Sequence, residues 1–298
     1  MDGQEWLADR FEEHRPRLRA VAYRMLGSLP EADDAVQETW LRLSRAGGDE
    51  VDNLGGWLTT VVARVCLNVL RSRRARREEP LDLRLPDPVV RPEEGPDEQA
   101  VLADSVGLAL LVVLDALSPA ERLAFVLHDM FGLDFDEIAG LVGRSSAAAR
   151  QLASRARRRV RGAELPAADV DRARQRAVVD AFFAAARGGD FDRLVTLLHP
   201  DVVLRADFGG RRPKAPRVVR GAAAVARQAQ IGALPAAELH PVLVNGAAGA
   251  VVTVRGRPFA VLGFTVVGDR IAEIDAIADP ERVARIAAPV LGAPGHGR

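Results

Sequence analysis

The spacing of apolar residues along the chain changes near residue 171. Before this point apolar residues recur every three or four positions, which is typical of amphipathic helices. After it, a helix over residues 177–185 and a short helix ending at His199 and Pro200 precede runs rich in Val, Ile and Leu, separated by Gly, Pro or Asn turns. The pattern therefore predicts a helical N-terminal half and an α+β C-terminal half.

Capping and stop signals divide the first helical block into three helices. Gly27 ends the first helix, Ser28-Leu-Pro-Glu31 has the pattern of a capping box that begins the second, and the third runs from Gly56 to Arg77. The residues expected to form the apolar stripe of the second helix are Ala35, Val36, Trp40, Leu41 and Leu43.

A helix-turn-helix motif is predicted over residues 134–161. Asp134-Phe-Asp-Glu137 caps a short helix that Gly143 ends, and a basic helix without any acidic residue follows. The spacing of three and four residues predicts that this helix packs inward through Ala149, Leu152, Ala156 and Val160.

The C-terminal half is expected to contain five strands and one later helix. The strands are predicted over residues 202–206, 239–244, 250–254, 259–267 and 270–277, and the helix over residues 222–230. At 298 residues the chain is longer than one core usually organises. We therefore expect a helical domain over residues 5–77, a linker over 78–104, a second helical domain over 105–161, a short linker over 162–171 and an α+β domain over 172–290.

Charge is sorted into patches although the formal net charge is zero. Residues 28–40 contain four acids and no base, residues 52–77 contain six arginines and one acid, and residues 78–104 contain nine acids and five prolines. Prolines at this density forbid a continuous helix, so the linker is expected to be extended. The single cysteine, Cys66, excludes a disulfide framework or a cysteine-based zinc site. Neither a signal peptide nor a membrane span is evident, so we expect a cytoplasmic protein without a membrane partner.

The basic helix over residues 144–161 points to DNA as a partner. Arginine can pair with guanine and glutamine with adenine in the major groove, whereas a merely solvated helix usually mixes both charge signs. The residues expected to contact DNA are Arg144, Ser145, Ser146, Ala147, Arg150, Gln151, Ser154, Arg157 and Arg158.

Three motifs in order resemble the sigma-2 and sigma-4 domains of extracytoplasmic-function sigma factors. They are the segment from Glu31 to Leu43, the segment from Gly56 to Arg64, and Leu117-Ser-Pro-Ala-Glu-Arg122. The resemblance implies binding to the bacterial RNA polymerase core and to promoter DNA, with the basic helix at the −35 element. It also implies that the polymerase clamp contacts Asp33, Asp34, Gln37 and Glu38.

The resemblance places −10 recognition in the loop after the second helix and along the third helix. A pocket and hydrogen-bond donors are needed to capture an unpaired base. The residues carried over, or expected from their exposed position, are Ala46, Asn53, Val61, Arg64, Asn68, Arg71, Arg73 and Arg74. Trp57 is open to two interpretations, a core anchor, which we favour, or a wedge in melted DNA.

The C-terminal half resembles the SnoaL-like, NTF2-like cone, whose relatives include polyketide cyclases and ketosteroid isomerases. A small ligand or an enzymatic proton transfer is therefore an alternative for this domain. The polar candidates are His199, Arg205, Asp207, His240 and Asp275. Because spacing identifies no acid-base pair among them, we expect neither catalysis nor a cofactor nor a metal.

The combination of sigma domains and a cone resembles the SigJ-like group. Three segments carry this resemblance, and each departs from the group's pattern: Arg84 replaces a Trp, Phe208 a Gly and Asp279 an Asn. The resemblance implies a regulator inside the chain, so that no separate anti-sigma factor is required. The residues expected to join the linker to the cone are Leu85, Pro86, Asp87, Pro88, Asp207, Gly209, Gly210, Arg211, Asp279 and Pro280.

Three classes of protein therefore remain open at this point. The favoured one is a sigma factor regulated by its own cone. The others are an enzyme or small-molecule sensor fused to a DNA-binding module, and an ordinary helix-turn-helix repressor or activator. The acidic helix disfavours the last class, which has no use for a polymerase-binding surface. The linker itself either tethers the helical domains or threads through a polymerase channel.

Overall fold

The computed structural model describes residues 3–46, 53–76, 84–93, 107–163, 171–209 and 218–292. The chain forms two compact units, one of residues 1–80 with 110–164 and the other of residues 81–109 with 165–298. The domain limits derived from the sequence stay a prediction. The described part of the acidic linker, residues 84–93, belongs to the same compact unit as the C-terminal domain.

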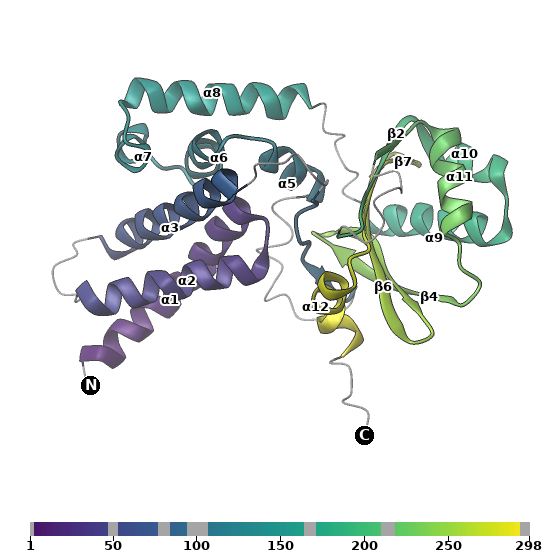
Figure 1. Cartoon of the computed structure of the whole chain (residues 1–298), viewed down its shortest axis with the longest axis horizontal. Coiled ribbons are helices and arrows are strands. Elements are labelled where there is room, and N and C mark those ends of the chain that lie inside the picture. The colour runs from purple at the N-terminus through teal and green to yellow at the C-terminus, as the bar shows by residue number, and fades with distance from the viewer. Residues whose placement is uncertain are drawn as a thin grey trace. The chain divides into compact units, whose positions relative to one another are not determined.

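The first unit begins with three packed helices, α1 (Gly3–Leu26), α2 (Leu29–Ala46) and α3 (Leu54–Arg76) (Figure 1). Gly27 ends α1 in the left-handed conformation at φ 67°, and its N–H donates to the Tyr23 carbonyl at 2.8 Å. The prediction that α2 buries Leu41 is wrong, because Leu41 lies about 200° around the helix from the buried Leu43.

The same unit continues with α5 (Leu108–Asp115), α6 (Pro119–Phe125), the π-helical turn η2 (Val126–Met130), α7 (Phe135–Val142) and α8 (Ser146–Gly162). Capping boxes are present at Ser118 with Glu121, which begins α6, and at Asp134 with Glu137, which begins α7. Gly143 ends α7 at φ 67°, which confirms the turn of the helix-turn-helix motif. Helix α8 packs inward through Ala149, Leu152, Ala153 and Ala156, while Val160 is partly exposed.

The second unit is built on a seven-stranded sheet in the order β1-β4-β5-β6-β7-β2-β3. Only β2 and β7 are parallel neighbours; the other pairs are antiparallel. The bounds of the strands are Val90–Arg91 for β1, Leu198–Asp207 for β2, Val218–Arg220 for β3, Ala237–Val244 for β4, Ala247–Val254 for β5, Arg257–Val267 for β6 and Arg270–Ile277 for β7.

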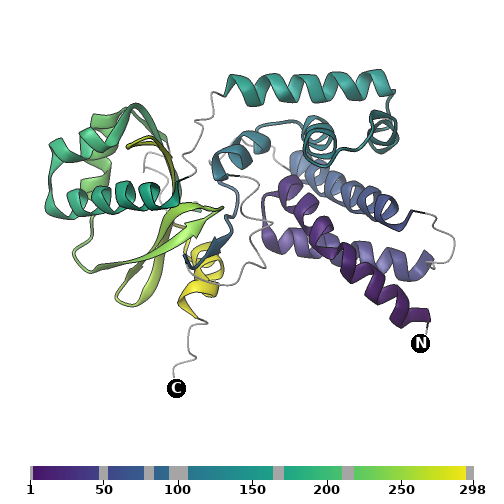
Figure 2. The ribbon, with the colours of Figure 1, turned by 180° about the vertical axis from the view of Figure 1, so that it is seen from behind.

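Four helices cover this sheet. They are α9 (Arg172–Gly188), α10 (Phe191–Leu197), α11 (Ala222–Gly232) and α12 (Pro280–Leu291). Helices α9, α10 and α11 form one apolar core with the sheet, in which Phe182, Phe183 and Phe264 meet edge to face. Figures 1 and 2 show α12 on the other side of the sheet from α10 and α11. The predicted fold class, helical domains followed by an α+β domain, is confirmed.

The pattern of the sequence missed three elements of the second unit. The short strands β1 and β3 are two and three residues long, too short for a two-residue period to show. Helix α12 was not predicted, although Asp279 caps it and Pro280 occupies its first turn. The helix predicted to end at His199 and Pro200 ends at Leu197, because β2 already begins at Leu198.

Candidate nucleic-acid interface and linker-binding cluster

The outward face of α8 presents the residues predicted to contact the −35 element. Ser145 caps the helix by accepting the N–H of Ala148 at 3.3 Å, and Ser146 hydrogen-bonds to Asp136 of α7. The exposed members of the set are Arg144, Ser145, Ala147, Arg150, Gln151, Ser154 and Arg158, while Ser146 and Arg157 are half-buried.

The arginines of α8 differ in their partners. The Arg150 guanidinium lies 5.5 Å from the centroid of the Phe135 ring, which restrains it while leaving it exposed. Arg157 pairs with Asp129 at 3.0 Å and Arg159 with Glu121 at 3.3 Å. Within the described parts of the chain, Arg144 and Arg158 take part in no ion pair. Arg144 and Arg158 can therefore bind a phosphate directly, whereas Arg157 can do so only after its ion pair with Asp129 breaks.

The predicted polymerase-binding residues lie together on α2. Asp33, Asp34 and Gln37 are exposed and Glu38 is half-buried. Asp33 accepts hydrogen bonds from Nε and Nη2 of Arg19 at 2.6 and 3.0 Å, and Glu38 accepts one from Nε of Arg42 at 2.9 Å. Asp34 thus carries the exposed charge of this face that takes part in no ion pair among the described residues.

The residues predicted for −10 recognition fall into an exposed set and an engaged set. Ala46, Asn53, Arg64, Asn68, Arg71 and Arg74 are exposed, and Val61 is half-buried. Asn53 accepts the N–H of Gly56 at 3.0 Å and so caps α3. Arg73 pairs with Glu31 and donates to the Leu26 carbonyl at 3.1 Å, which fastens α3 to the end of α1. Trp57 is half-buried rather than enclosed in the core.

Arg282 of α12 is the centre of a group of residues that holds the linker, here called the linker-binding cluster: Leu85, Asp87, Asp207, Gly209, Asp279 and Arg282. Arg282 donates to the Asp87 carboxylate at 2.7 Å, to the Leu85 carbonyl at 2.6 Å and to Asp207. Asp207 in turn accepts the Leu85 N–H at 2.9 Å and the Gly209 N–H at 3.0 Å. One guanidinium therefore joins the linker to the last residue of β2.

The cluster is buried, which strengthens its electrostatic interactions. Asp87 is 3% exposed, Asp207 2% and Arg282 8%. Burial alone lowers the pKa of Arg282, but the carboxylates of Asp87 and Asp207 outweigh it and raise this pKa above its ordinary value. Removing one partner from such a group leaves a buried charge without compensation and costs about 3–5 kcal/mol.

Further contacts fix the linker along the sheet. Val89 and Asn245 exchange hydrogen bonds at 2.8 and 2.9 Å, and Val90 pairs with Val244 so that β1 extends the sheet beyond β4. Glu93 accepts Arg176 of α9 at 2.6 Å. The linker is thus buried from residue 85 to residue 90, and its strand β1 forms one edge of the sheet.

The structure brings together most of the residues predicted to join the linker to the C-terminal domain. Leu85, Pro86, Asp87, Pro88 and Asp207 are buried. Gly209 lies against Asp279, which also caps α12, while Pro280 is exposed at the start of that helix. Gly210 and Arg211 lie outside the described residues. The sequence-based prediction missed Arg282 and Asn245, although Arg282 ends the Asp279-Pro-Glu-Arg282 segment that carries the resemblance.

The polar residues considered for catalysis form closed pairs instead of an open site. Arg205 binds Glu273 at 2.8 Å and Asp275 at 3.1 Å. Burial raises the pKa of Asp275 to about 6, although Arg205 opposes this shift. Nε2 of His240 forms a hydrogen bond with Oγ1 of Thr253 at 3.1 Å, and Nδ1 of His199 accepts the Asp201 N–H at 3.2 Å. Within the described residues no group of three or more His, Cys, Asp or Glu side chains could hold a metal ion.

Comparisons with known proteins show the family of this chain. Residues 10–76 match the family model Sigma-70 region 2, and residues 107–160 match Sigma-70, region 4. The ECF RNA polymerase sigma factor SigJ of Mycobacterium tuberculosis is 45% identical over 220 residues, which cover 73% of this chain and 70% of SigJ. The chain belongs to the extracytoplasmic-function family of RNA polymerase sigma factors.

Two further relatives extend the likeness of this sigma factor. A protein designated probable ECF RNA polymerase sigma factor SigI of Mycobacterium tuberculosis is 41% identical over 65% of this chain and 67% of its own length. The crystal structure of Mycobacterium tuberculosis SigJ matches with a TM-score of 0.73 at 37% identity, covering 92% of this chain and 97% of that one. The likeness therefore includes the C-terminal domain. None of the helices in the described residues could span a bilayer.

Proposed function

We propose that this sigma factor recruits the RNA polymerase core through α2, recognises the −35 element with α8 and the −10 element with α3, and is regulated by its own C-terminal domain. The observation that carries the regulatory part is the bridge that Arg282 makes between Asp87 of the linker and Asp207 of β2. It fixes the segment that connects the two promoter-binding regions of the chain.

The proposed assignment of surfaces rests on exposure and charge. The exposed carboxylate of Asp34 suits a basic partner surface, and the exposed guanidinium groups of Arg144 and Arg158, which form no ion pair with the described residues, suit phosphates. Arg150 sits nearer the start of the helix, where recognition helices contact base edges. This arrangement supports sequence recognition by Arg150 and backbone contact by Arg158.

We further propose that the C-terminal domain acts as a regulator and not as an enzyme. Arg205 pairs with both Glu273 and Asp275, so the raised pKa of Asp275 belongs to a buried ion-pair group. A regulator in the same chain requires no separate anti-sigma factor. As a protein that works with RNA polymerase, the chain would act in the cytoplasm. A small ligand of the C-terminal domain is compatible with this proposal.

Transcription by three chains of different length tests the proposal. The intact chain is compared with chains that end after residue 279, which removes α12 and Arg282, and after residue 161, which removes the whole C-terminal domain. Promoter-dependent run-off transcription and affinity for core polymerase are measured with each. Both shortened chains should differ from the intact chain in the same direction. Equal activity and equal core affinity in all three would show that the C-terminal domain has no regulatory role.

A further inference from the structure

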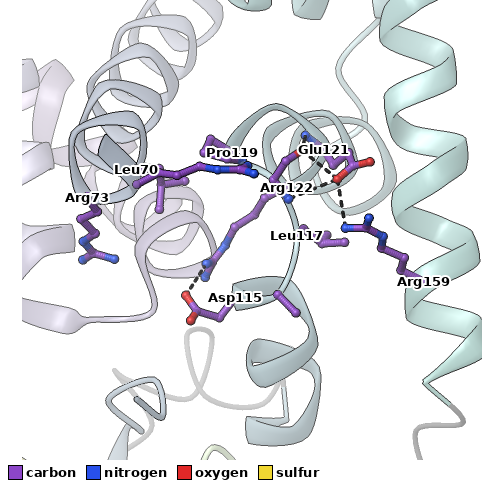
Figure 3. A pocket seen from close by; sticks show the side chains of 11 residues that line it. Leu70, Arg73, Asp115, Leu117, Pro119, Glu121, Arg122 and Arg159 are labelled. Atoms are coloured by element: carbon purple, nitrogen blue, oxygen red, sulfur yellow. Dashed lines mark hydrogen bonds and ion pairs between the residues drawn. The ribbon is translucent and has the colours of Figure 1, made fainter. Parts of the chain in front are cut away.

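A cavity of about 610 Å³ lies inside the first unit, between α3 and the segment formed by the end of α5, α6 and α8. Its volume falls in the range of about 300–1,000 Å³ that is usual for small-molecule sites. The walls are rich in arginine: Arg73 and Arg74 come from α3, Arg122 from α6 and Arg159 from α8. Figure 3 shows Arg122 between Asp115 on one side and Glu121 with Arg159 on the other.

The charges that line the cavity do not cancel. Four arginines line the cavity against two carboxylates, those of Asp115 and Glu121, and Arg73 is paired with Glu31 of α2, so among the described residues one positive charge is left in excess. Arg74 is exposed and takes part in no ion pair within the described residues. The cavity therefore attracts anions.

Arg122 is an independent indication of a missing acceptor. This residue is 1% exposed, and it donates to the Arg24 carbonyl at 3.0 Å and to Asp115 at 3.0 Å. Its remaining terminal nitrogen, Nη2, is buried and has no hydrogen-bond partner among the described residues. A buried charged donor without an acceptor is costly, so Arg122 gains stability from an acceptor that reaches this nitrogen when the cavity wall shifts. Burial also lowers the pKa of Arg122, although the Asp115 carboxylate opposes this shift.

We propose that this cavity binds a small phosphorylated ligand, whose phosphate oxygens accept from Arg74, Arg122 and Arg159. Arginine is the side chain best suited to phosphate, because its planar fork donates two parallel hydrogen bonds. The shared chemistry is a terminal phosphate or diphosphate group. The walls come from α3 and from the helix-turn-helix region, so a bound ligand favours the arrangement in which these helices lie together.

Calorimetric titration of the full chain at low salt tests this site with four probes. Pyrophosphate and ADP should bind, while adenosine, which lacks phosphate, should not. Tighter binding of ADP than of pyrophosphate assigns the site to a phosphorylated nucleoside, and equal binding assigns it to the phosphate group alone. Sulfate should bind more weakly than pyrophosphate because it carries less charge. Absence of binding by both pyrophosphate and ADP overturns the proposal.

Three substitutions separate this site from general attraction to a basic surface. Arg74→Gln should weaken binding of pyrophosphate about tenfold, the loss of one charge-assisted contact. Asp115→Asn should strengthen it several-fold, because a lining carboxylate is removed. Arg158→Gln is the matched control: it lies on α8 next to Arg159 but does not line the cavity, so binding should change less than about twofold.

Two results of the substitutions contradict the proposal. Equal weakening by Arg74→Gln and Arg158→Gln means that the anion is attracted by net charge and not held in the cavity. Weaker binding in Asp115→Asn, with an unchanged melting temperature, means that no phosphate lies near this carboxylate. Displacement of ADP by single-stranded DNA at equal phosphate concentration assigns the arginines to nucleic acid and also overturns the proposal.

Discussion

Arg282 and Asp87 form a buried ion pair across 195 residues of sequence, with the Arg282 Nε donating to Asp87 Oδ1 at 2.7 Å. Asp87 lies in a linker that the sequence describes only as acidic and rich in proline. Its partner, Arg282, lies in the first turn of α12. This pair explains why the linker residues belong to the same compact unit as the C-terminal domain.

Replacing Arg282 with Met should destabilise the second unit strongly. Two buried carboxylates, Asp87 and Asp207, would lose their cation, at a cost of about 3–5 kcal/mol in the free energy of unfolding. Scanning calorimetry measures this change. All tryptophans and the single tyrosine lie in residues 6–57, so the transition of the second unit is absent from the fluorescence signal.

Arg285→Gln is the matched control for this change. Arg285 also contacts Asp87, at 3.3 Å, but its side chain is 50% exposed. Its loss should cost less than about 1 kcal/mol. If Arg285→Gln and Arg282→Met were equally destabilising, the buried position of Arg282 would not be the source of its effect.

Gly209→Ala should destabilise the linker-binding cluster, because the added methyl group would collide with the Asp279 side chain. Gly209 has φ 55°, and a Cβ at this position would lie 2.6 Å from Asp279 Cγ. Gly268 has nearly the same φ, 58°, with open space around a Cβ. Gly268→Ala should therefore cost only the backbone term of about 1–2 kcal/mol, and Gly209→Ala distinctly more. Equal melting temperatures of the two variants would exclude close packing of Gly209 against Asp279.

Asp275 should make the stability of the second unit depend on pH. Its folded pKa, raised to about 6 by burial, lies above the unfolded value of about 3.9. The folded form therefore binds the proton more tightly, and this stabilisation is present below about pH 4 and is lost as the pH rises through about 6.

Asp275→Asn removes this dependence because the amide cannot ionise. Relative to the wild type, the variant should gain about 2–3 kcal/mol between pH 4 and pH 7.5, seen as a difference in melting temperature. Asp269→Asn, in the exposed turn before β7, is the control for the loss of one carboxylate, and it should leave the melting temperature close to that of the wild type. A constant difference between Asp275→Asn and the wild type would show that Asp275 stays ionised throughout.

Two arginines of α8 should differ in their effect on promoter binding. Arg150→Ala should cost about 1–3 kcal/mol at one base position of the −35 element, because we propose that its guanidinium, restrained by Phe135, recognises a base. Arg158→Ala should weaken binding to all sequences alike and reduce the salt dependence. Binding measurements on a set of single-base variants at two salt concentrations distinguish these results. Identical profiles for both substitutions would mean that the faces of α8 are wrongly assigned.

Local signals in the sequence were sufficient for the helical unit. Gly27 and Gly143 end helices because they adopt positive φ, and both capping boxes act within four residues. Such features depend on near neighbours and can be predicted. The exposed face of α8 followed from the same spacing rule.

The linker-binding cluster could be predicted only in part, because its geometry depends on distant partners. The sequence indicated that Asp87, Asp207 and Asp279 belong together through a resemblance, but not that Arg282 neutralises the first two. The burial of Asp87 follows from a partner 195 residues away. An Asp-Pro pair followed by Val283, Ile286 and Ala287 was a usable sign of α12, since Asp caps helices and Pro suits the first turn.

The measurement that tests the central claim most directly is run-off transcription by the Arg282→Met variant. It is compared at equal core occupancy with the intact chain, the Arg285→Gln control and the chain ending after residue 279. The account predicts that Arg282→Met matches the shortened chain, while Arg285→Gln matches the intact chain. If Arg282→Met transcribed like the intact chain while the shortened chain did not, regulation through the contacts of Arg282 with the linker would be contradicted.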